Sequence, residues 1–87
     1  MLKHIEIDGR LYGHCQVLKL IAYLRDRHGF TVIVKTVANS GINCWVCLGA
    51  EGRGASSRCG RSLWHCVSAW VSDVAIPLIE SERKGGN

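Results

Sequence analysis

The sequence has 87 residues, 47% of them apolar, and it carries a net charge of +4. This length predicts one domain with a modest core, and the apolar content argues against intrinsic disorder. No signal peptide or membrane-spanning run is recognisable, so we expect a cytoplasmic protein with no membrane association. The basic excess favours an anionic partner.

Two short strands joined by a tight turn are predicted at the amino terminus. Ile5 and Ile7 alternate with polar residues, and Asp8-Gly9 suits a turn in which both residues need a positive φ. Apolar residues then recur at helical spacing and predict a helix from His14 to about Arg27. Gly29 suits the left-handed position that commonly follows a helix.

The middle of the chain is predicted to form strands. Phe30–Ala38 is rich in β-branched residues, Ile42–Leu48 is the next strand, and Arg53–Ser56 is a short third one. In the second strand the apolar even positions are expected to face the core: Ile42, Cys44, Val46 and Leu48. Trp45 then lies on the opposite face, where it is either exposed or covered by the amino-terminal hairpin.

The last helix is predicted to begin near Ser57 or Ser62, since either serine can cap it. Gly60 inside an early helix would cost about 1 kcal/mol relative to alanine, which favours the later start. Pro77 should end the helix at Ile76. Its apolar face is broad enough to cover the sheet and to offer a homodimer surface, and comprises Leu63, Trp64, Val67, Trp70, Val71, Val74 and Ala75.

These elements predict the α+β class. We expect a two-layer sandwich in which an antiparallel sheet of about three strands, plus the short amino-terminal hairpin, packs against two helices. Residues 1–80 form the single domain, and residues 81–87 are expected to be a disordered polar tail.

The five cysteines are expected to be largely buried thiols, without a metal or other cofactor. Cys44 and Cys47 have the spacing of a zinc knuckle, but residues three apart on a strand point to opposite faces. A small structural-zinc module therefore stays an alternative. His65 and Cys66 are neighbours on a helix and do not face each other, so we expect no enzyme.

A nucleic-acid hypothesis arises from the glycine-rich basic segment at residues 52–61. Its order of glycine, any residue, glycine, any residue, serine and then basic residues resembles the third strand and second-helix entrance of double-stranded-RNA-binding domains. The predicted order of elements from His14 to Ile76 is also similar. The resemblance implies that Arg58 and Arg61 contact phosphates, with Ser57 in place of a lysine.

We therefore predict a non-catalytic protein that recognises a nucleic acid or a nucleoprotein. Its binding residues are expected to be Arg53, Ser57, Arg58 and Arg61, extended by Lys35, Arg25 and Arg27 and by stacking on Trp45. In size and economy the chain is also similar to small phage-encoded inhibitors, including anti-CRISPR proteins. That alternative implies contact with a protein effector complex.

Overall fold

The computed structural model describes residues 2–39, 42–48 and 56–85, with the backbone alone for 35–39, 42–48 and 85. The elements, in chain order, are β1 (His4–Ile7), β2 (Arg10–Gly13), a 3₁₀ turn (His14–Gln16), α1 (Val17–His28), β3 (Ile33–Asn39), β4 (Ile42–Leu48), β5 (Ser57–Gly60), α2 (Leu63–Trp70), a π-helical turn (Val71–Ala75) and α3 (Ile76–Gly85). The predicted α+β class is confirmed. No helix in the described part of the chain is both long and apolar enough to cross a membrane.

The amino-terminal hairpin forms as predicted. Asp8 and Gly9 both have positive φ, 52° and 76°, and Ile7 pairs with Arg10 across the turn. Ile5 and Ile7 are both buried. The hairpin therefore buries its apolar face and leaves its turn at the surface.

The first helix ends where the sequence indicates. Gly29 follows α1 with a φ of 73°, and its N–H donates to the carbonyl of Arg25 at 3.1 Å. A left-handed residue at this position is inexpensive only for glycine. His28 is thereby fixed as the last helical residue, close to the hairpin turn.

The central strands pair in antiparallel order. β3 pairs with β4 from Ile33 opposite Leu48 to Asn39 opposite Ile42. β4 also pairs with β5, which begins at Ser57, immediately after the segment predicted as the third strand. Arg53 to Ala55, and the side chains predicted to face the core from β4, lie outside what the structure describes.

Of the two predicted starts for the last helix, the later one is correct. Ser62 caps α2, because its Oγ accepts from the N–H of His65 at 3.1 Å. Gly60 lies in β5, so it weakens no helix.

The predicted end of this helix at Ile76 is wrong. The helix passes through a π-helical turn and continues as α3 to Gly85. In that turn the N–H of Ile76 bonds to the carbonyl of Val71, five residues back. This wider turn, and the place of Pro77 in the first turn of α3, accommodate a residue that has no N–H and that would crowd an α-helical carbonyl.

The tail expected to be disordered from residue 81 is helical as far as Gly85. Arg83 and Lys84 lie in its last turn, where positive charge stabilises the helix dipole. Arg83 also binds Asp8 in the hairpin turn. The polar composition of this segment therefore marks an exposed helical turn.

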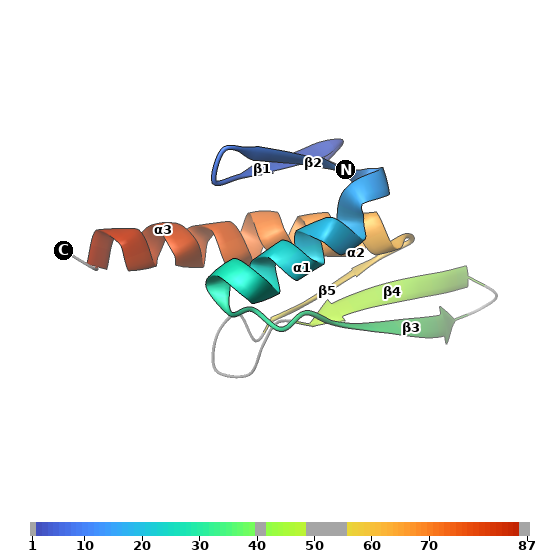
Figure 1. The fold of residues 1–87 in the computed structure, drawn as a ribbon. Helices are drawn as coiled ribbons and strands as arrows, with labels where there is room; N and C mark the ends of the chain where they lie inside the picture. Colours follow the sequence, from blue (N-terminus) through green and yellow to red (C-terminus); the bar gives the residue numbers. More distant parts are fainter. Residues whose placement is uncertain (1, 40–41, 49–55, 86–87) are drawn as a thin grey trace.

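The core lies where the hairpin meets the helices. Figure 1 shows the hairpin and strands β3 to β5 on opposite sides of the helices. The rings of Phe30 and Trp70 meet edge to face at 5.5 Å. Val67, Trp70 and Val71 are fully buried within the chain, whereas Leu63 and Val74 of the same helix face are only partly buried.

Candidate functional site

The described members of the predicted binding patch lie where β5 leads into α2. Ser57 and Arg58 are in β5, and Arg61 is exposed in the turn that precedes the cap of α2. The resemblance to double-stranded-RNA-binding domains implied that Arg58 stands at the start of a helix. In the structure Arg58 is a strand residue, because the helix begins only at Leu63.

Arg58 is held by contacts within the chain. Its Nε donates to Oδ2 of Asp73 at 3.2 Å, and its Nη1 donates to the carbonyl of Ser57 at 2.9 Å. Asp73 comes from the π-helical turn, so this pair joins β5 to the middle of the long helix. The Arg58 side chain is still 34% exposed.

A close approach of two backbones fixes this entrance. A Cβ built on Gly60 would lie 2.9 Å from the backbone nitrogen of Cys66 and 2.9 Å from Cβ of His65. The thiol of Cys66 donates to the carbonyl of Arg58 at 3.1 Å. The strand therefore rests directly on the first turn of α2, and only glycine fits at position 60.

Lys35, Trp45 and Arg53 can be placed only by backbone register or not at all. Lys35 pairs with Val46, which pairs with Cys59, and Trp45 pairs with Gly60. In the sheet, Trp45 therefore lies on the strand next to that of Arg58, and Lys35 lies one strand further away. Arg53 lies outside the described residues.

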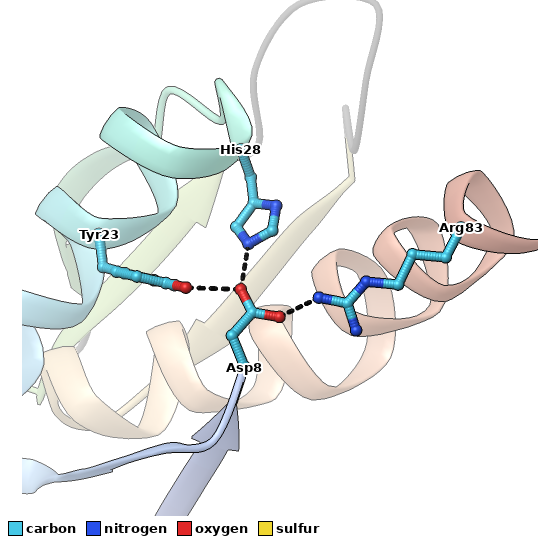
Figure 2. Close-up of polar contacts among 4 residues, drawn as sticks. All are labelled: Asp8, Tyr23, His28 and Arg83. Atoms are coloured by element: carbon cyan, nitrogen blue, oxygen red, sulfur yellow. Dashed lines mark hydrogen bonds and ion pairs between the residues drawn. The ribbon is translucent and has the colours of Figure 1, made fainter. Parts of the chain in front are cut away.

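A second polar cluster surrounds Asp8 in the hairpin turn (Figure 2). The hydroxyl of Tyr23 donates to Oδ2 of Asp8 at 2.6 Å, and Nε2 of His28 lies 2.6 Å from the same oxygen. Arg83 of α3 donates to the other oxygen, Oδ1. One carboxylate thus joins the hairpin, α1 and α3.

These donors shift the acidity of the cluster. The Tyr23 hydrogen bond, with those of His28 and Arg83, holds the pKa of Asp8 well below its usual range, although partial burial opposes the shift. The pKa of Tyr23 is raised, first because its proton is hydrogen-bonded to Asp8 and then because of burial. Asp8 is therefore ionised at neutral pH.

Sequence reasoning missed this cluster. Asp8 has partners 15, 20 and 75 positions away. Contacts at such separations leave no spacing pattern in one sequence. The available signals were the turn position of Asp8 and the place of His28 at a helix end.

The thiols are less buried than expected. Cys66 is buried, but Cys15 and Cys59 are exposed, and Sγ of Cys15 lies 3.7 Å from Nδ1 of its neighbour His14. Within the described residues, no three histidine, cysteine, aspartate or glutamate side chains are arranged to hold a metal ion. The side chains of Cys44 and Cys47 lie outside that description.

No family of known proteins, no curated protein and no solved structure matches the chain.

Proposed function

We propose that the chain is a non-catalytic binding protein that recognises a nucleic acid, free or within a nucleoprotein, through the entrance of α2. The supporting observation is the pair Arg58 and Arg61, which flank Gly60 immediately before the capped start of α2. The sandwich of about three strands and two helices is the framework that we propose for presenting them.

The electrostatics of this entrance suit an anion. Arg61 is exposed and stands next to the positive end of the α2 dipole. Guanidinium groups bind phosphate oxygens with paired N–H donors, and such contacts supply most of the affinity for nucleic acids.

The ion pair with Asp73 is compatible with binding. It occupies Nε and Nη1 of Arg58, while Nη2 makes no hydrogen bond within the described part of the chain. The pair also holds the long arginine side chain in one orientation, which lowers the entropy lost when a phosphate binds.

The test is an affinity measurement on duplex RNA and duplex DNA by fluorescence anisotropy at several salt concentrations. Arg58→Ala with Arg61→Ala should weaken binding at least about tenfold and lower the salt slope by about 2, since each phosphate contact contributes about 0.9. Lys3→Ala with Lys19→Ala removes the same charge elsewhere and is the matched control.

Asp73→Asn is the second control. It removes the negative charge beside Arg58 but keeps a side-chain oxygen that can accept from Nε, so binding should be unchanged or tighter. Equal affinities for the arginine variant and the lysine control would refute this function. The function would also be refuted if the chain captured one protein complex but bound neither duplex RNA nor duplex DNA.

A further inference from the structure

A hollow of about 570 Å³ opens beside Asp8, and none of the residues that line it belongs to the α2 entrance. Its volume lies within the roughly 300–1,000 Å³ of typical small-molecule sites. The lining comes from the hairpin, α1 and α3, and consists of Asp8, Arg10, Tyr23, Arg27, His28 and Arg83. Three arginines thus face one concave surface.

Arg10 and Arg27 both act on Tyr23, but neither is paired with an acidic side chain in the described part of the chain. Both are exposed. The guanidinium carbon of Arg10 lies 5.1 Å from the centre of the Tyr23 ring. This cation–π contact holds the guanidinium beside the ring, where it can still donate hydrogen bonds to a ligand.

The negative charge of Asp8 is offset by its ion pair with Arg83, which leaves the charges of Arg10 and Arg27 in excess at the hollow. Arg83 also lines a smaller hollow of about 90 Å³ with Glu6 and Glu80. Acidic side chains therefore surround Arg83, and Arg10 and Arg27 are the stronger anion ligands.

We propose that this hollow binds a phosphate group through Arg10 and Arg27, while Arg83 offsets the charge of Asp8. The phosphate belongs either to a nucleic-acid backbone or to a small phosphorylated molecule. The site shares no residue with the α2 entrance, so either proposal can fail without the other. Asp8 sets the position of Tyr23 and hence of Arg10.

The experiment is a titration of the ¹⁵N-labelled chain with inorganic phosphate, followed by NMR at constant ionic strength with chloride as the balancing anion. Saturable shifts are expected for the amides of Arg10, Tyr23, Arg27 and His28. Arg10→Gln with Arg27→Gln should weaken phosphate binding at least about tenfold, because both guanidinium forks are removed. Lys3→Gln with Arg25→Gln is the charge-matched control, because neither residue lines the hollow, and it should bind as the original chain does.

Arg10→Lys with Arg27→Lys keeps the charge but loses the planar forks, so an intermediate affinity is expected. Shifts that grow linearly without saturation, or equal affinities for Arg10→Gln with Arg27→Gln and for the charge-matched control, would overturn the site. The source of the phosphate follows from competition. Displacement by a short DNA oligonucleotide identifies a nucleic-acid backbone, and displacement only by a nucleoside monophosphate identifies a small ligand.

Discussion

The two basic regions of the molecule are built in opposite ways. The α2 entrance is assembled from a few neighbouring residues, and a direct contact between the backbones of β5 and α2 fixes it. The hollow beside Asp8 is assembled from the hairpin, α1 and α3, and charged side chains fix it. The contribution of the entrance to the unfolding free energy should therefore depend on steric fit and change little with pH. The contribution of the contacts beside the hollow should change with pH.

The largest effect is expected at the entrance from Gly60→Ala. The new Cβ would lie 2.9 Å from the backbone nitrogen of Cys66, which cannot move unless α2 shifts. Overpacking of this kind costs about 2.5 kcal/mol in the free energy of unfolding, measured by urea denaturation.

Gly13→Ala is the matched control, because its Cβ would meet only the His4 ring, with Cδ2 at 3.5 Å and Nε2 at 3.9 Å, both ordinary contact distances. Its effect should stay within about 0.5 kcal/mol, as for most surface substitutions. Similar losses for both alanine variants would mean that β5 does not rest on α2 as closely as described.

The second-largest loss of stability is expected beside the hollow, from Asp8→Asn. At pH 7 this change removes the charge that binds Arg83 and should cost about 1.5 kcal/mol, the range of hydrogen bonds to charged groups. The pKa of Asp8 is lowered in the folded state, so its ionised form stabilises the fold above the unfolded pKa of about 4. That contribution is lost as the pH falls through the lower, folded-state pKa.

The measurement is the unfolding free energy of both proteins from pH 7 to pH 2. The gap between them should be constant at higher pH and should narrow below about pH 4. Asp26→Asn, in an exposed pair with Arg25, is the control and should show little gap. A gap for Asp8→Asn that persists unchanged at pH 2 contradicts the charge-based account.

The contrast between the regions also explains what the sequence could predict. The hairpin turn, the glycine end of α1 and the cap of α2 depend on residues within a few positions of one another, and all three are confirmed. The continuation through Pro77 was not predictable from local preference, because it depends on a π-helical turn.

The candidate sites divide in the same way. Arg58 and Arg61 stand out in the sequence because they are close together in a glycine-rich segment. Arg10, Arg27 and Arg83 are far apart in the chain, and only the packing of α1 and α3 around the hairpin turn brings them to one hollow. The partners of Asp8 could not be predicted from the sequence for the same reason.

A smaller effect is expected from Ser62→Ala, which removes the side-chain cap of α2. The N–H of His65 would lose its acceptor, and the typical cost of such a loss is about 1 kcal/mol. Ser57→Ala is the control, since Ser57 is exposed in β5 and the bond from Arg58 uses only its carbonyl. If Ser57→Ala were the more destabilising change, the helix would have to begin earlier than Leu63.

The smallest effect is expected from the pair Arg58 and Asp73, whose side chains are 34% and 56% exposed. A double-mutant cycle with Arg58→Ala and Asp73→Ala should give a coupling of about 0.5 kcal/mol, reduced by added salt, as for other exposed ion pairs. Such a weak coupling means that the ion pair adds little to folding, and if the unfolding free energy of Arg58→Ala alone is also close to that of the original chain, a loss of nucleic-acid affinity reports a lost contact with the ligand. A coupling well above 1 kcal/mol would instead make Arg58 a structural residue, and Arg61 alone would then have to account for binding at the entrance.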